Sequence, residues 1–256
     1  MDGLGRLHRP GDTPVHRLPP QCKLVATGAF VLAVVSTPRE AVWAFAVHAA
    51  LLAVVAAIAR VPPHFVLRRM TIEIPFVAFA ALLPFVAQGP RVEALGVPLS
   101  ESGLWAAWNI LAKASLGTAA SILLAATTEP RQLLVGLERL RLPSLLVQIA
   151  AFMIRYADVI VGEMRRMRTA RAARGFQARD VRAARVLARS AGALFLRSYE
   201  RGERVHLAML SRGYQGRMPV LHEAAATGRQ WAAAAAPPAL AALVAVAAWV
   251  AAWMVR

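Results

Sequence analysis

Long apolar segments constrain the fold of this sequence more than any other feature. The segment Leu104–Thr127 contains a single charged residue, Lys113. Its length exceeds the roughly 20 residues that a helix needs to cross the hydrocarbon core of a bilayer. An unusually alanine-rich soluble domain would have a similar composition. The apolar segments favour an all-α integral membrane protein.

Other apolar segments of the chain have the same character. Leu24–Thr37 is short and needs its flanks to span a bilayer, whereas Ser144–Val161 is long enough but contains Arg155 and Asp158. Charges at mid-membrane are costly unless they pair, so we expect this last segment to pack at the inner surface or against the other helices. About five spans are therefore expected, or six if it crosses: Leu24–Thr37, Ala41–Ala59, Thr71–Gln88, Leu104–Thr127 and Trp231–Val255.

The distribution of charge predicts an orientation. The chain has a formal net charge of +16, and most of its 30 Lys and Arg residues fall between Glu129 and Arg229. Because Lys and Arg accumulate on the cytoplasmic side of membrane proteins, this block, the N-terminal tail and the loop Arg60–Arg69 are predicted to be cytoplasmic. The expected location is the cell inner membrane, with a cytoplasmic N-terminus and an external C-terminus.

These expectations divide the chain into four parts. Residues 1–23 form a loose cytoplasmic tail, rich in Pro, Gly, Arg and His and without apolar periodicity. Residues 24–127 form the first four spans, and residues 231–256 form the C-terminal span. Between them, residues 128–230 form a cytoplasmic region of helices.

Two sites in this cytoplasmic region share a local pattern. In each, an Arg stands at the expected end of a helix and is followed by a Gly and an aromatic residue. Gly commonly ends helices in the left-handed conformation, and Arg there complements the helix dipole while its planar fork remains able to bind a carboxylate. The other arginines are expected to face solvent or lipid headgroups. The two sites are Ala173-Arg174-Gly175-Phe176 and Ser211-Arg212-Gly213-Tyr214.

Paired Ala-Arg-Gly-like motifs on cytoplasmic helices resemble the transmembrane T component of energy-coupling factor transporters. The second copy has Ser211 in place of Ala, which is also small. The wider sequence is similar to the cobalt/nickel, CbiQ-type branch from about Lys23 onward, although Pro19–Lys23 lacks the acidic residue that usually precedes the first span in that family. The similar segments are Arg68-Arg69, Glu73–Phe76, Leu82–Phe85, Leu137–Pro143 and Ala208–Tyr214.

This resemblance implies a non-catalytic membrane subunit of an ATP-driven importer for a transition-metal ion, either cobalt or nickel. Arg174 and Arg212 would each enter a groove of one of two cytoplasmic ATPase subunits and pair with carboxylates there. Two long helices crossing beneath the membrane would carry the motion to a substrate-capturing S-type membrane subunit. ATP would be bound by partner subunits, so no cofactor is expected in this chain.

Residues that commonly carry chemistry predict no catalytic or metal site. The six His residues include no close pair at ligand spacing, Cys22 stands apart from them, and no phosphate-cradling Gly-Lys-Ser/Thr loop occurs. Possible intramembrane polar residues are Glu73, Lys113, Arg155 and Asp158. Glu73 is expected to act as an interfacial cap. Lys113 is expected to line a polar path or to pair with Glu73 or Asp158.

Two other functions remain as alternatives. A permease subunit of a conventional ABC transporter would also dock ATPases, but it would use one acidic coupling loop rather than two Arg-Gly ends. A membrane-tethered binder of anionic lipid or nucleic acid would use scattered, interchangeable arginines. The repeated ends favour the T component, with membrane lipid as a partner and no nucleic acid.

Overall fold

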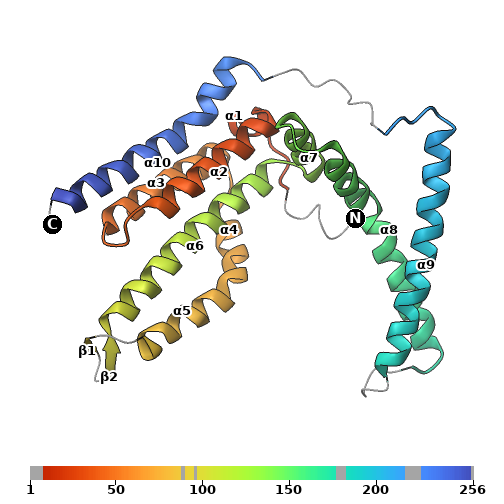
Figure 1. Cartoon of the computed structure of the whole chain (residues 1–256), viewed down its shortest axis with the longest axis horizontal. Coiled ribbons are helices and arrows are strands. Elements are labelled where there is room, and N and C mark those ends of the chain that lie inside the picture. Colours follow the sequence, from red (N-terminus) through yellow and green to blue (C-terminus); the bar gives the residue numbers. More distant parts are fainter. Residues whose placement is uncertain (1–7, 88–89, 95–96, 177–182, 217–225, 255–256) are drawn as a thin grey trace. The chain divides into compact units, whose positions relative to one another are not determined.

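The computed structural model describes residues 8–87, 90–94, 97–176, 183–216 and 226–254 (Figure 1). Contacts divide the chain into two compact units. The first, here called the helical bundle, comprises Gly5–Leu140 and Ala225–Arg256, and the second, the helical hairpin, comprises Met1–Leu4 and Arg141–Ala224. In the bundle, the elements are α1 (Pro14–Arg17), α2 (Pro20–Ser36), α3 (Val42–Ile58), α4 (Pro63–Arg69), the 3-10 turn η1 (Met70–Glu73), α5 (Ile74–Val86), β1 (Arg91–Ala94), β2 (Val97–Ser100), α6 (Glu101–Thr127), α7 (Pro130–Arg139) and α10 (Gly228–Met254). The hairpin contains α8 (Ser144–Ala173) and α9 (Ala183–Leu210).

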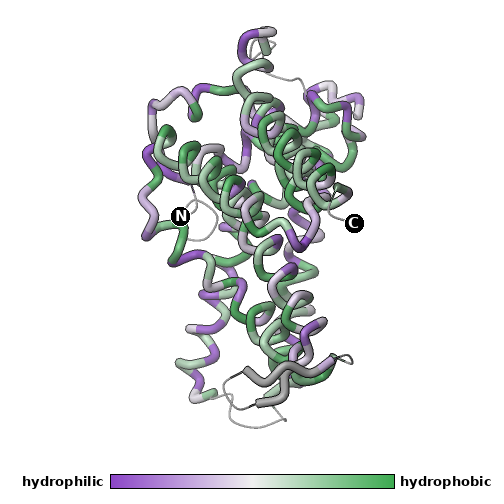
Figure 2. The backbone as a smooth tube through the Cα atoms, turned by 90° about the vertical axis from the view of Figure 1, so that its left-hand side faces the viewer, coloured by the Kyte–Doolittle hydropathy of each residue, from purple (hydrophilic) through white to green (hydrophobic). Residues whose placement is uncertain are grey.

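Over its described residues, every predicted span is largely helical, which confirms the all-α membrane fold. In the described part of the chain, four helical stretches are long and apolar enough to cross a membrane: Pro63–Val86, α6, α8 and α10. The helices α2 and α3 are apolar but have 17 residues each. Most of the long helices are coloured as hydrophobic in Figure 2, and hydrophilic segments gather at their ends and connections.

Small side chains let α10 lie close to α2 and α3 (Figure 1). Its buried residues recur at spacings of three and four, so they share one face of the helix. Because these side chains are small, neighbouring backbones can approach closely, which is how helices commonly associate in membranes. At the far end of the contact, Trp249 Nε1 donates to the carbonyl oxygen of Ser36 at 2.7 Å. The buried residues of α10 are Ala234, Pro238, Ala241, Ala245 and Ala248.

A glycine allows α5 and α6 to touch. A Cβ atom at Gly103, in the first turn of α6, would lie 2.7 Å from both the carbonyl oxygen of Leu83 and the Cα of Pro84. Both atoms belong to the α5 backbone, so they cannot move aside as a flexible side chain could. Gly103 therefore fixes how closely these two helices pack.

The N-terminal segment is more ordered than the sequence predicts. Thr13 caps α1, accepting a hydrogen bond from the amide of His16, and Pro14 follows in the first helical turn. The amide of Arg9 donates to the carbonyl oxygen of Ala126 at 2.9 Å, at the end of α6. Residues 8–18 thus pack onto the bundle instead of forming a loose tail, because the end of α6 offers carbonyls that this segment satisfies.

The connection between α5 and α6 also contains structure that the sequence does not predict. Strands β1 and β2 pair antiparallel there, with Arg91 opposite Ser100 and Ala94 opposite Val97. Beyond this small hairpin, Ser100 caps α6 by accepting a hydrogen bond from the amide of Gly103.

Candidate coupling site at two helix ends

The two helices of the hairpin run antiparallel. Near the start of α8, Gln148 accepts a hydrogen bond from the hydroxyl of Tyr214, just beyond the end of α9, at 2.5 Å. Further along α8, Glu163 forms an ion pair with Arg197 in the middle of α9. The ends of α8 and α9 that carry Arg174 and Arg212 therefore lie at opposite ends of the hairpin. Gln148 and Arg174 are about 40 Å apart along α8, at the usual rise of about 1.5 Å per residue.

The end of α8 has the geometry of a Schellman motif. Gly175 has a φ of +74°, in the left-handed region. The amide of Phe176 donates to the carbonyl oxygen of Arg171 at 3.1 Å, and the amide of Gly175 donates to that of Ala172 at 3.0 Å. These bonds satisfy carbonyls that a helix end otherwise leaves free, and they place Arg174 at the capping position.

The end of α9 repeats this geometry. Gly213 has a φ of +81°. The amide of Tyr214 donates to the carbonyl oxygen of Met209, and that of Gly213 donates to Leu210, both at 3.0 Å. Arg212 thus occupies the position that Arg174 occupies in α8. The left-handed glycines predicted from the sequence are present at both ends.

Both guanidinium groups are available to a partner. Arg174 and Arg212 are exposed, and within the described residues neither has a hydrogen bond or an ion pair. The preceding residues, Ala173 and Ser211, are also exposed and small. The hydroxyl of Ser211 donates to the carbonyl oxygen of Ala208 on its own helix at 3.0 Å. Its hydrogen is therefore already bonded, and a partner would meet a small side chain similar to alanine.

Residues that the sequence did not single out hold the hairpin together. Besides binding Tyr214, the side chain of Gln148 donates to the carbonyl oxygen of Gly216 at 3.1 Å. Glu163, which lies beyond the apolar part of α8, binds both Arg166, at 2.5 Å, and Arg197. Hydrogen bonds from Arg166 and Arg197 hold the pKa of the Glu163 carboxyl below its usual range. Polar residues at the start and past the middle of α8 were the only sequence signal for these contacts.

The four predicted intramembrane polar residues do not gather into one site. Glu73 is 5% exposed and accepts a hydrogen bond from Ser115 at 2.9 Å, and its other carboxylate oxygen has no hydrogen-bond partner among the described residues. Lys113 instead donates to the carbonyl oxygen of Val35 at 2.7 Å, so it does not pair with Glu73. Arg155 and Asp158 are exposed on α8.

The hairpin has almost no core of its own. Among its described residues only Val147 and Ala183 are buried hydrophobic side chains. A cavity of about 400 Å³ separates α8 from α9 and is lined by aromatic and aliphatic side chains, including Phe152 and Met209. The exposed large hydrophobic side chains of the hairpin include Leu145, Met153, Phe195, Leu196 and Leu207.

Comparison with known proteins identifies the family of this chain. The model of the family described as "Cobalt transport protein", CbiQ, matches residues 11–221. The chain is 31% identical over 198 residues to cobalt transport protein CbiQ of Rhodobacter capsulatus, covering 77% of this chain and 79% of that one. It is 27% identical over 223 residues to the energy-coupling factor transporter transmembrane protein EcfT of Heliobacterium modesticaldum, covering 81% and 82% of the two chains. The chain therefore belongs to the CbiQ family and is a transmembrane component of an energy-coupling factor transporter.

Proposed function

We propose that this chain is the T subunit of an energy-coupling factor importer for cobalt or nickel ions, and that Arg174 and Arg212 each bind one of two cytoplasmic ATPase subunits. The observation that carries the proposal is the repeated cap at opposite ends of one antiparallel hairpin. Two equivalent arginines about 40 Å apart along the helix suit two equivalent partners. Scattered arginines serving one anionic surface would need no such repetition.

Charge pairing at these ends explains how motion of the ATPases reaches the membrane. A guanidinium that enters a groove and pairs with a carboxylate loses its water, so removing one partner strands a charge at a cost of about 3–5 kcal/mol. Such a contact holds while the ATPases move. The hairpin helices, of 30 and 28 residues, then tilt with their ends instead of detaching.

The apolar surface of the hairpin suits a second kind of partner. Phe195 and Leu207 are more than half exposed, which is unusual for a soluble surface left uncovered. We assign this face to a substrate-capturing S-type membrane subunit, which would hold the metal ion as cargo. The cobalt assignment rests on the names of the CbiQ family and of the relative from Rhodobacter capsulatus.

The proposal assigns no catalysis to this chain. ATP would be bound and hydrolysed by the two partner ATPases, with the hairpin and the N-terminus on the cytoplasmic side. No group of three or more His, Cys, Asp or Glu side chains that could hold a metal ion occurs among the residues that the structure describes. The metal would pass through the partner that captures it.

Co-purification in detergent with candidate ATPase subunits tests the proposal. Wild type should retain the ATPases, and the Arg174→Ala, Arg212→Ala double variant should lose them while remaining folded. The matched control is Arg168→Ala with Arg189→Ala, which removes two exposed arginines from the same helices but from outside the caps. Equal loss in both double variants would favour a general basic surface for lipid or nucleic acid. Full retention in the cap variant would refute the coupling role.

A further inference from the structure

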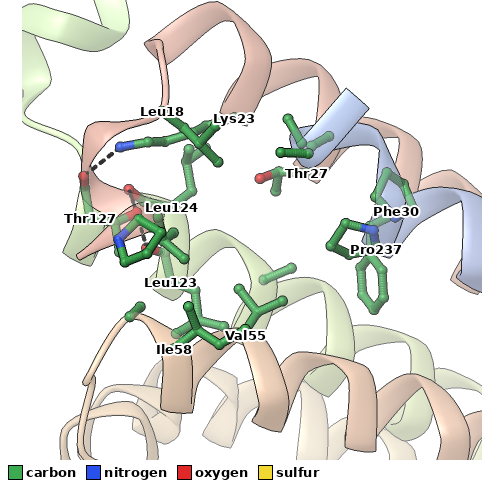
Figure 3. Close-up of a pocket in the computed structure, with 18 of the residues that line it drawn as sticks. Leu18, Lys23, Thr27, Phe30, Val55, Ile58, Leu123, Leu124, Thr127 and Pro237 are labelled. Atoms are coloured by element: carbon green, nitrogen blue, oxygen red, sulfur yellow. Dashed lines mark hydrogen bonds between the residues drawn. The ribbon is translucent and has the colours of Figure 1, made fainter. Parts of the chain in front are cut away.

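The helical bundle contains a cavity of about 440 Å³ that the coupling role does not use (Figure 3). Its walls come from α1, α2, α3, α6 and α10, and Phe30, Val55, Leu123 and Pro237 face into it. Small residues on these walls, among them Ala120, leave the space open. The volume lies within the range of about 300–1,000 Å³ that is typical of sites for small ligands.

The cavity lies toward the basic side of the bundle. It is bounded by the first half of α2, the second half of α3, the end of α6 and the first half of α10. The connections at these helix ends carry the N-terminal basic residues and the Arg60–Arg69 loop. In the proposed orientation, the cavity therefore opens at the depth of the cytoplasmic leaflet.

The charged side chains that line the cavity are both cationic. Lys23 is 6% exposed, and its ammonium donates to the carbonyl oxygen of Thr127 at 2.8 Å (Figure 3). It also donates to the hydroxyl of Thr128 at 3.3 Å and to the carbonyl oxygen of His16 at 3.1 Å. These partners are neutral, so they leave its charge uncompensated. Arg229 is exposed in the first turn of α10, where the positive end of the helix dipole adds to its field. The part of the lining that Lys23 and Arg229 contribute is thus positive, and we take it as the mouth of the cavity.

The interior, by contrast, is apolar. Leu51, Val55, Ile58 and Leu124 contribute aliphatic side chains to the wall. A buried water usually needs two to four polar partners, and a wall of this kind supplies few. An apolar space of this size at leaflet depth fits hydrocarbon, and its positive mouth fits an anion.

We propose that this cavity holds an acyl chain of an anionic phospholipid from the cytoplasmic leaflet. The chain lies between α2, α3, α6 and α10, and the headgroup phosphate lies at the mouth, bound by Arg229 and attracted by the charge of Lys23. The lipid fills the space left by the small side chains, and the single negative charge of its phosphodiester offsets part of the charge of the two cations. The site is in the bundle, so its presence does not depend on ATPase coupling by the hairpin.

Native mass spectrometry of the full chain in detergent tests this site, with phosphatidylglycerol and phosphatidylcholine of identical acyl chains as probes. Wild type should bind one phosphatidylglycerol roughly five- to thirtyfold more tightly than phosphatidylcholine, because one or two nearby cations each favour the headgroup with a net negative charge by about 1 kcal/mol. Arg229→Gln should reduce that preference. Arg131→Gln, which removes an exposed arginine of α7 that does not line the cavity, should keep it.

A bulky side chain in the cavity tests the acyl-chain part of the proposal. Ala233→Trp on α10 and Thr27→Trp on α2 each fill the cavity from a different wall. A melting curve first shows that each variant is folded. Either folded variant should then retain neither lipid. Equal binding of the two lipids by wild type would overturn the proposal. So would unchanged retention in the folded Trp variants, or displacement of phosphatidylglycerol by millimolar inorganic phosphate, which would indicate a small-anion site.

Discussion

In the helical bundle, Val34 and Ala241 have no exposed surface, whereas in the helical hairpin Phe195 is 68% exposed and Leu207 is 63% exposed. The bundle has buried clusters between its own helices, often against alanine and glycine, although other side chains, such as Leu32 and Trp253, are exposed. The hairpin is joined by a few polar contacts and leaves its apolar surface bare. The bundle therefore has a core of its own, and in the proposed role the hairpin gains its burial from the partners that it binds.

This difference predicts that the two units respond differently to substitution. A change inside the bundle should lower thermal stability. A change at a hairpin end should mainly weaken the binding of a partner and should lower the melting temperature of the isolated chain less.

The largest effect is expected for Gly103→Ala in the bundle. Its Cβ would lie 2.7 Å from two backbone atoms of α5, so the helices must separate, at a cost of about 1–3 kcal/mol. A thermal melt of the detergent-solubilised chain measures this loss. Gly117→Ala on the same helix is the control, because a Cβ there meets nothing within 4 Å. Equal melting temperatures of the two variants would mean that the contact at Gly103 does not limit how closely α5 and α6 pack.

A smaller effect is expected for Gly175→Ala and Gly213→Ala in the hairpin. Both glycines have positive φ values, and an L side chain in that conformation costs about 1–2 kcal/mol. The caps should distort and move the arginines, weakening ATPase binding by roughly fivefold or more at each altered end. Binding is measured by titration with labelled ATPase. Gly192→Ala in α9, at a position without a positive φ, should bind the ATPase as tightly as wild type does. If this control weakened ATPase binding by a comparable factor, the effect of the other two variants would not come from the caps.

Tyr214→Phe should have a smaller effect, confined to one end. The change removes the hydroxyl that donates to Gln148, a bond with a net contribution of about 0.5–1.5 kcal/mol. Amide hydrogen exchange at the end of α9 should become faster, while exchange at the end of α8 stays unchanged. Tyr199→Phe, at an exposed tyrosine of α9, is the control. Unchanged exchange in Tyr214→Phe would show that this bond does not hold the second cap.

The smallest effect is expected for Glu163→Gln. Arg166 and Arg197 lower the pKa of the Glu163 carboxyl in the folded hairpin, so the ionised carboxylate stabilises the hairpin. This stabilisation is fully present above the unfolded pKa of about 4.3, and it is lost as pH falls through the lowered folded pKa. At pH 7 the variant should therefore broaden the distance distribution between spin labels on α8 and α9. Under strongly acid conditions the variant and wild type should match.

Glu200→Gln is the control for this change, because Glu200 lies near Arg204 of its own helix and does not join the two helices. A broadening in Glu200→Gln as large as that in Glu163→Gln would indicate a general charge effect. A Glu163→Gln variant that behaves as wild type at pH 7 would show that the bond to Arg197 does not hold the hairpin closed.

Features set by short stretches of sequence were predictable. The spans follow from the length and composition of their own segments, and the two caps follow from Gly175 and Gly213, whose conformation is a local property. In contrast, the burial of Lys23 depends on Thr127, more than 100 positions along the chain, and no local pattern indicates this contact. The bond from Tyr214 to Gln148 and the pair of Arg197 with Glu163 likewise require two helices to meet.

The number of ATPase subunits that bind one chain distinguishes docking at the two helix ends from docking elsewhere. Native mass spectrometry of the purified chain with an excess of ATPase subunits should show two ATPases on wild type, one on Arg174→Ala, one on Arg212→Ala and none on the double variant. That series would mean that each arginine-bearing helix end holds one subunit. Two ATPases on the folded double variant would contradict the account, because docking would then lie elsewhere on the chain.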